Sequence, residues 1–221
     1  MKIGVIVAMD KEYGQLEKSL AEYIERGEVI LAKCGIGKVN AALGAAEMIR
    51  QHHPDCIISS GCAGGNGDDL QIQDVVVSSE LTYHDVYCGT AIDDCTIYGQ
   101  VQGLPARYQV DARLLDTAQQ TGAKPGLIVT GDWFVDSKDK MRSIVGKFPD
   151  AKAVDMESCA IAQTCYIYKV PFISFRIISD IPLSDTDASQ YHDFWNSMAD
   201  RSFHVTNGFI RRLMDDKADA V

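Results

Sequence analysis

The feature of this sequence that most restricts its fold is the regular alternation of apolar runs with helix-like segments. The apolar runs occupy residues 2–8, 28–35, 55–65, 74–85, 126–132, 153–157 and 171–180. The helix-like segments are at 10–20, 38–52, 111–120, 137–148, 158–169 and 191–216. Strands that are apolar on both sides are typical of a sheet covered by helices on both faces. We therefore predict an α/β fold.

Length and charge narrow the class of protein. With 221 residues and no linker or repeat, the chain is predicted to form one domain over residues 1–221. No run approaches the roughly 20 apolar residues that cross a bilayer, and the charged cluster at residues 10–12 is unlike a signal peptide, so we expect a cytoplasmic protein. The net charge of −10 disfavours nucleic acid and anionic membranes as partners, but not a nucleoside of little charge.

Cysteine and histidine show no arrangement suited to a metal. The seven cysteines are odd in number, scattered and free of CxxC pairs, and the five histidines lack metal-ligand spacing. We predict neither a disulfide framework nor a metal site, and expect most cysteines to be small buried side chains.

Polar residues and glycines gather where the predicted strands stop. In open α/β sheets, ligands bind outside the carboxyl ends of the strands. Here those ends contain Met9–Glu12, Gly61–Gly65, Asp132–Phe134, Asp155–Glu157 and Ser179–Asp180. The sequence therefore indicates one site assembled from several strand ends.

Two of these stretches suit a planar ligand, although each has a structural alternative. In "SGCAGG", glycines such as Gly64 allow a ligand close to the backbone, or simply form a tight turn. In "GDWFVDS", Phe134 can stack on a base whose edge is read by the backbone of Val135, or can pack in the core.

Charged residues in apolar surroundings mark the remaining candidates. "AVDMESCAIAQ" places Asp155 and Glu157 at the edge of a core, where a buried acid needs a partner. "RIISD" places Arg176 inside an apolar strand, and a buried Arg requires an acid, for which Glu12 is the predicted partner. Asp180 ends that strand, either as a functional acid or as a helix cap.

Seven motifs, in order, resemble one known family. They are "VIVAMDKE", "CGIGKVNAALG", "SGCAGG", "YHD", "GLIVTGDWF", "AVDMESCAIAQ" and "VPFISFRIISD", which span nearly the whole chain. Together they look like the 5′-methylthioadenosine/S-adenosylhomocysteine nucleosidase family of the nucleoside phosphorylase superfamily. "MES" and "RIISD" carry most of the specificity.

The resemblance implies a fold and a reaction. It implies the nucleoside phosphorylase-like fold, three-layer α/β/α with a mixed central sheet, in a homodimer whose partner subunit closes part of the site. It implies hydrolysis of the bond between adenine N9 and ribose C1′, without a metal or organic cofactor, in methionine salvage. In such a reaction an acid protonates adenine while a water attacks the sugar from the opposite face. This resembles glycoside hydrolysis, in which one carboxyl group acts as general acid and another as general base.

The resemblance also implies residue roles. Asp180 would protonate adenine N7 with help from Ser179, and Phe134 and Val135 would bind the base. Glu12 would activate the water, with Arg176 nearby and Cys62 on the same side. The sugar would be held by Glu157 and Met156, and the alkylthio end by Met9, Ile36 and Tyr191.

Four departures from the family pattern concern the site. Cys62 replaces a usual Ser, Asp155 replaces a usual Glu, and Pro182 stands where a small residue is usual. The segment from Tyr87 to Tyr98, which would form the partner-facing wall, matches poorly after "YHD". These changes leave the preferred 5′ substituent open.

Three other functions compete. A phosphorylase would need a basic anion site, for which only Arg176 is apparent. A nucleosidase acting on 6-amino-6-deoxyfutalosine would share these motifs. A non-catalytic nucleoside-binding protein would be expected to lack the acids that this chain keeps.

Overall fold

The structure, a computed structural model, describes residues 1–89, 97–184, 189–197 and 203–218. The strands are β1 (Ile3–Val7), β2 (Val29–Lys33), β3 (Cys56–Gly65), β4 (Val75–Tyr83), β5 (Tyr108–Gln109), β6 (Lys124–Thr130), β7 (Ala151–Asp155) and β8 (Phe172–Asp180). The helices are α1 (Asp10–Glu25), α2 (Lys38–His52), α3 (Ala112–Gln119), α4 (Lys138–Val145), α5 (Ser158–Tyr168), α6 (Ser189–Ser197) and α7 (His204–Ala218).

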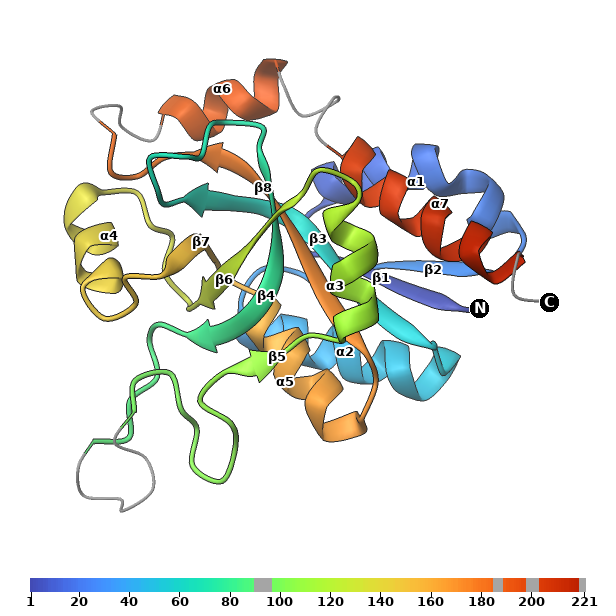
Figure 1. Cartoon of the computed structure of the whole chain (residues 1–221), viewed down its shortest axis with the longest axis horizontal. Helices are drawn as coiled ribbons and strands as arrows, with labels where there is room; N and C mark the ends of the chain where they lie inside the picture. The colour runs from blue at the N-terminus through green and yellow to red at the C-terminus, as the bar shows by residue number, and fades with distance from the viewer. Residues whose placement is uncertain (90–96, 185–188, 198–202, 219–221) are drawn as a thin grey trace.

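The strands form one mixed sheet that curls back on itself (Figure 1). β3 is parallel to β1 and β8, and β6 is parallel to β4 and β7. β4 and β8 pair antiparallel, and so do the carboxyl ends of β3 and β7. The pairings β3–β8–β4–β6–β7–β3 thus close a ring, from which β1 and β2 extend. This closure brings the ends of β3, β7 and β8 together.

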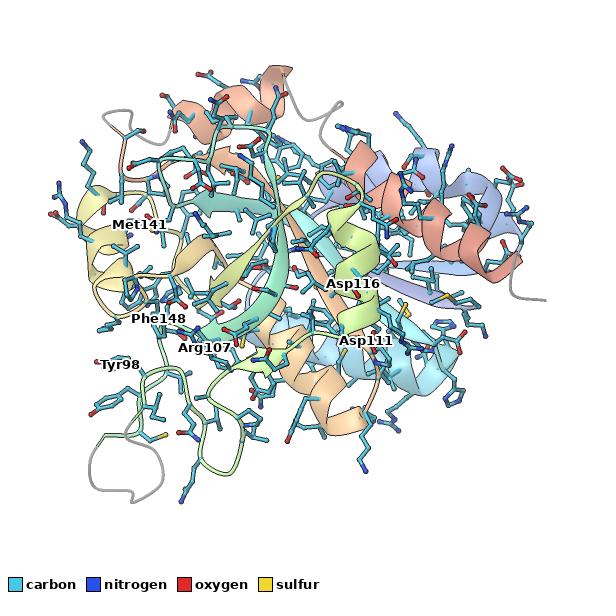
Figure 2. All side chains as sticks on the ribbon, viewed as in Figure 1. Tyr98, Arg107, Asp111, Asp116, Met141 and Phe148 are labelled. Atoms are coloured by element: carbon cyan, nitrogen blue, oxygen red, sulfur yellow. The ribbon has the colours of Figure 1, made fainter. Side chains whose placement is uncertain are left out.

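Helices cover both faces of the sheet, as the apolar strands predict. On one side, Ile3, Val5 and Val7 of β1 pack in a core with residues of α1 and α7. On the other side, Ile6 packs in a core with residues of α2 and α5. Alternate residues of β1 thus serve two cores, which confirms the predicted α/β fold with a helical layer on each face. A third core joins Met141 of α4 and nearby Phe148 to β6 and β7 (Figure 2).

The element boundaries follow local sequence signals. The Asp111 carboxylate accepts hydrogen bonds from the backbone N–H groups of Arg113 and Leu114, and so begins α3. Ser137 begins α4 in the same way, by accepting a bond from the N–H of Lys140. Such caps satisfy N–H groups that have no partner within the helix.

Some predictions were incomplete or wrong. The single helix predicted over 191–216 is two helices, because Phe203 lies in a turn before α7 begins. The short strand β5 was not predicted. Of the six described cysteines, Cys56, Cys159 and Cys165 are buried and the others are only half-buried. Part of the predicted wall from Tyr87 to Tyr98, residues 90–96, lies outside the described residues, although the rings of its two end residues stack 4.3 Å apart.

Within the described residues, no helix combines the length and apolar character needed to cross a membrane.

Candidate active site

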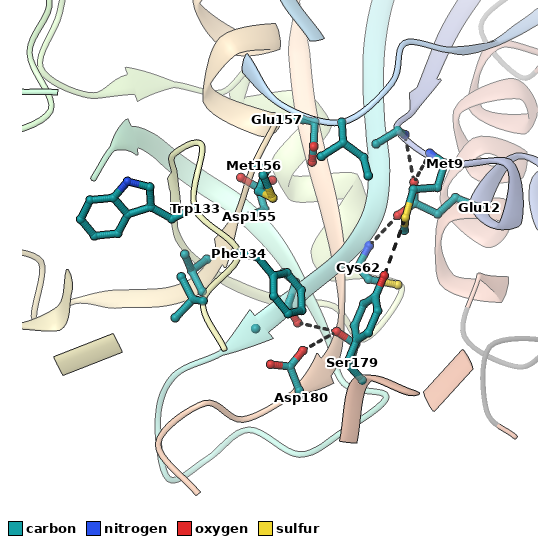
Figure 3. A pocket seen from close by; sticks show the side chains of 17 residues that line it. Met9, Glu12, Cys62, Trp133, Phe134, Asp155, Met156, Glu157, Ser179 and Asp180 are labelled. Carbon is teal, nitrogen blue, oxygen red and sulfur yellow. Dashed lines mark hydrogen bonds between the residues drawn. The ribbon is translucent and has the colours of Figure 1, made fainter. Parts of the chain in front are cut away.

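A pocket lies where β1, β3, β6, β7 and β8 end (Figure 3). Its lining of apolar side chains with a few convergent acids suits a small organic ligand. All the predicted site residues except Arg176 line it, namely Met9, Glu12, Ile36, Cys62, Gly64, Phe134, Val135, Met156, Glu157, Ser179, Asp180 and Tyr191. Side chains far apart in the sequence therefore share one cavity.

Glu12 is buried at the start of α1, and backbone donors orient its carboxylate. Oε2 accepts hydrogen bonds from the N–H groups of Ala8 at 2.9 Å and Met9 at 3.0 Å, and Oε1 accepts one from Cys62 at 3.0 Å. Gly61 makes room for it, since a Cβ there would lie 2.7 Å from Oε1. Burial raises the pKa of Glu12, against the opposing effects of Arg176 and these three N–H groups. A carboxylate of raised pKa is a better proton acceptor near neutral pH.

Arg176 is only 2 % exposed and lies behind the pocket wall rather than in it. Its Nε donates to Asp155 Oδ2 at 2.6 Å, and its Nη2 donates to Ser59 Oγ at 2.9 Å. The predicted pairing of Arg176 with Glu12 is therefore wrong. The positive charge of Arg176 still opposes the rise that burial causes in the pKa of Glu12. Backbone N–H groups already donate to the Glu12 oxygens, however, and the guanidinium bonds to Asp155 instead.

Asp155 ends β7 and is the centre of a buried polar network. Besides Arg176, it accepts hydrogen bonds from Thr130 Oγ1 at 2.5 Å, from the Ser158 N–H at 3.1 Å and from Ser158 Oγ. Buried charges are tolerated when they are paired and hydrogen-bonded in this way. The first acid of "AVDMES" therefore anchors Arg176 behind the pocket.

Glu157, the second acid of that stretch, lines the pocket. Its Oε1 accepts a hydrogen bond from the Gly37 N–H at 2.9 Å. Burial, and secondarily Asp155, raise the pKa of Glu157 to about 7, although Arg176 and the Gly37 N–H oppose the rise. Its other oxygen has no protein partner among the described residues and remains available to a ligand hydroxyl.

The end of β8 carries a bulge that sets the position of Asp180. Pairing with β3 is regular until Ala63 lies opposite Ile178, and then skips Ser179 so that Gly64 lies opposite Asp180. Bulges next to sites re-aim side chains. Ser179 Oγ donates to Asp180 Oδ1 at 2.7 Å. Burial raises the pKa of Asp180 and the Ser179 hydroxyl opposes that rise, so this acid holds a proton more readily than a solvated one.

An aromatic edge and a thioether complete the pocket. Phe134 is 47 % exposed and lines the pocket, whereas Val135 is buried. The ring of Tyr191 packs edge-on to Phe134 at 5.4 Å, and its hydroxyl donates to Met9 Sδ at 3.7 Å. The exposed Phe134 ring is free to stack on a planar ligand.

Sequence reasoning did not single out several residues around this pocket. Trp133 lines its mouth, and was noted only as part of a motif. Behind it, Lys38 Nζ donates to both Asp85 oxygens at 2.8 and 2.7 Å, and the Lys38 N–H donates to Asp132 Oδ1 at 2.8 Å. These bonds join the loop that contacts Glu157 to the loop that carries Phe134. Asp85 in "YHD" could have pointed to this network, but nothing in the local sequence identifies Lys38 as its partner.

Within the described part of the chain, no group of three or more His, Cys, Asp or Glu side chains is arranged to hold a metal ion.

Changing Cys62 to Ser is expected to leave kcat within about threefold of wild type. The Cys62 backbone N–H, not its thiol, holds Glu12, and a hydroxyl is of similar size to the thiol and a better donor. Steady-state kinetics at pH 7 would measure this. Burial, and then Glu12, keep the pKa of the Cys62 thiol well above its usual range, so labelling by thiol reagents should be slow. A large fall in kcat with unchanged folding would give the thiol a role in the reaction.

Comparisons with known proteins agree with this arrangement. Residues 2–211 match the family model of the phosphorylase superfamily. The 5′-methylthioadenosine/S-adenosylhomocysteine nucleosidase of Exiguobacterium sp. is 35% identical, over 96% of this chain and 99% of the relative. The structure of such a nucleosidase from Colwellia psychrerythraea in complex with adenine has a TM-score of 0.87 and 31% identity, and covers 96% of each chain.

A second enzyme shares the fold at lower identity. The futalosine hydrolase of Helicobacter pylori has a TM-score of 0.84 and 26% identity, over 96% of this chain and 98% of that one. These likenesses confirm the nucleoside phosphorylase-like fold. From its matched length and its identity to the curated relatives, the chain belongs to the 5′-methylthioadenosine/S-adenosylhomocysteine nucleosidase family of the phosphorylase superfamily.

Proposed function

We propose that this protein hydrolyses the N-glycosidic bond of 5′-methylthioadenosine and S-adenosylhomocysteine, releasing adenine and the 5′-thioribose. The observation that carries the proposal is the placement of two acids in one pocket, Asp180 at the end of β8 and Glu12 on α1. Figure 3 shows them on different sides of the cavity. An acid and a base on opposite sides of a glycosidic bond suit hydrolysis by water.

At the base side, Asp180 donates its proton to adenine N7. Adenine is a poor leaving group as an anion, and protonation lets it depart neutral when the bond from N9 to C1′ breaks. Ser179, hydrogen-bonded to Asp180, positions the carboxyl group. Phe134 stacks on the purine, and the backbone of Val135 reads its edge.

At the sugar side, Glu12 takes a proton from water as the water oxygen bonds to C1′. The Ala8, Met9 and Cys62 N–H groups orient Glu12 for this step, and Arg176, behind the wall, opposes the rise in its pKa. Glu157 binds the 2′- and 3′-hydroxyls while Met156 packs on the ribose. Fixing the sugar in this way lowers the entropic part of the barrier.

The 5′ end of the nucleoside lies against Met9, Ile36 and Tyr191. Ile36 is 52 % exposed, and Val39 and Leu43 on the following helix α2 are 70 % and 64 % exposed. Such a patch suits a protein partner. We therefore infer a homodimer in which the second subunit covers this patch and closes the 5′ end of the site.

The whole chain, residues 1–221, then serves as one nucleosidase domain. We place it in the cytoplasm, in methionine salvage, where it needs no metal or organic cofactor.

Cleavage is expected to be independent of phosphate. Arg176 is engaged by Asp155, and no Lys or Arg is among the pocket-lining residues in the described part of the chain. A phosphate anion would instead meet Glu12 and Glu157. Adenine release should proceed at the same rate with and without phosphate at about 10 mM, a concentration that saturates sites of ordinary KM. Mass spectrometry should identify the free thioribose as the product. A rate that rises with phosphate, with a sugar 1-phosphate as product, would instead identify a phosphorylase.

The aminofutalosine nucleosidase alternative shares the acids and has the Helicobacter pylori likeness in its favour. A panel of 5′-methylthioadenosine, S-adenosylhomocysteine and 6-amino-6-deoxyfutalosine, compared by kcat/KM, would separate the substrates. Binding without cleavage of all three would identify a nucleoside-binding protein.

A further inference from the structure

In the described segment that follows Asp180, residues 181–184, no backbone N–H donates a hydrogen bond to its carboxyl group. The first N–H, of Ile181, donates to Gln190 Oε1 of α6 at 2.8 Å. The next residue is Pro182, which has no N–H. The turn closes when the Ser184 N–H donates to the Ile181 carbonyl at 2.9 Å. Within the described residues, the donor that reaches Asp180 is the Ser179 hydroxyl.

A residue other than proline at position 182 would change this. Aspartate side chains readily accept a hydrogen bond from the backbone N–H two residues further on. Pro182 is buried, and a buried N–H at that position would have to find an acceptor. Asp180 stands two residues before position 182, which is the spacing at which an aspartate side chain accepts such a bond. Such a bond stabilises the ionised form of the acid.

We propose that Pro182 is a positioning residue that withholds a backbone donor from Asp180, so that this carboxyl group keeps its proton until adenine accepts it. The inference rests on the proposed function, in which Asp180 is the general acid. The direction in which burial moves the pKa of Asp180 agrees with it.

Apart from the Ser179 hydroxyl, none of the described groups that face Asp180 would stabilise its ionised form, so a backbone N–H at position 182 would be the group that does. Cys62 of β3 and Tyr191 of α6 interact with it electrostatically, and burial holds the pKa of each above its usual range. Glu12 and Glu157 line the same pocket, but burial alone raises the pKa of Asp180 and the Ser179 hydroxyl opposes that rise. Among the described residues that line the pocket there is no cation to stabilise the ionised acid. A single N–H would therefore have a large effect.

Pro182 also has a packing role in the loop after β8. Its ring packs against Gly64, where an added Cβ would lie 3.0 Å from Pro182 Cγ. Proline also suits the second position of the turn that it occupies. A role confined to the turn would alter stability when Pro182 is replaced, but would leave the titration of Asp180 unchanged.

The test compares Pro182→Ala and Pro182→Gly, which both supply an N–H, with Pro171→Ala at the opposite end of β8. Carboxyl ¹³C NMR of labelled aspartate, with Asp180→Asn to assign the signal, follows the titration of Asp180 without requiring activity. In both Pro182 variants we expect its midpoint to move to lower pH by about 1 unit, the size of one charge-assisted hydrogen bond. Pro171→Ala should titrate as wild type.

Kinetics give a second measurement. Because the protonated acid is the active form, kcat falls as pH rises through the pKa of Asp180. In the Pro182 variants that fall should begin at lower pH, so that kcat above the midpoint is about tenfold below wild type. Unchanged NMR midpoints in folded Pro182 variants would overturn the inference. A wild-type enzyme that cleaves no nucleoside would overturn the proposed function and leave the NMR result standing.

Discussion

Replacing Asp180 with asparagine is expected to remove nearly all turnover while adenine nucleosides still bind. The amide keeps the shape of the carboxyl group but has no proton to transfer, and general acid catalysis contributes about 10²–10⁴-fold. The loss should fall at the upper end of that range, because adenine leaves poorly without a proton at N7. Single-turnover kinetics and equilibrium binding of 5′-methylthioadenosine would measure the two effects separately.

Asp116→Asn is the matched control, because it makes the same chemical change on an exposed residue of α3 and should leave kcat unaltered. If Asp180→Asn instead cleaves substrate within tenfold of wild type, the proton comes from another group and the role given to Asp180 is wrong. If binding is lost as well, Asp180 holds the base in the ground state rather than only in the transition state.

Asp155→Asn is expected to lower the free energy of unfolding by about 3–5 kcal/mol, the usual cost of removing one partner of a buried ion pair. The side chains of Arg176 and Asp155 are 3 % and 1 % exposed, so water cannot replace the lost charge. Urea unfolding followed by tryptophan fluorescence would give this value from the shift in midpoint.

Glu22→Gln is the control for that measurement. It removes the acid from the exposed Glu22–Arg26 pair, whose side chains are 78 % and 49 % exposed, and should cost less than about 1 kcal/mol. Replacing both buried partners, as in Asp155→Asn with Arg176→Met, should recover part of the loss because no buried charge is then left unpaired. A double variant no more stable than Asp155→Asn would show that the surrounding hydroxyl groups, rather than Arg176, depend on Asp155.

The strand ends could be predicted from sequence, but the partners formed there could not. Local patterns were sufficient to place Glu12, Glu157 and Asp180 where strands stop. The same patterns did not identify which acid pairs with Arg176. That pairing depends on three backbone N–H groups that already donate to the carboxylate oxygens of Glu12. Two of those donors, Ala8 and Met9, lie between β1 and α1, and the third, Cys62, lies in β3, so their meeting depends on the register of the whole sheet.

The closure of the sheet was equally out of reach of local patterns. The antiparallel pairing of Gly64 with Val154 and of Gly65 with Ala153 joins two strands that each read as ordinary buried runs. The turn at Phe203, between α6 and α7, interrupts a segment whose composition is helical throughout. In both cases tertiary packing decides between local conformations that the sequence tolerates equally.

The pairing of β3 with β8 also has a consequence for folding during synthesis. β3 ends at Gly65 and β8 begins at Phe172, so a stretch of nearly half the chain, residues 66–171, must be made after β3 before the two strands can meet. Until then β1 can cover one edge of β3, while the other edge stays open to aggregation. Glycine has low strand propensity, so the glycines at 61, 64 and 65 make that waiting edge a poor template for foreign strands. The residues that admit Glu12 and Pro182 to the finished site thus also protect the unfinished chain.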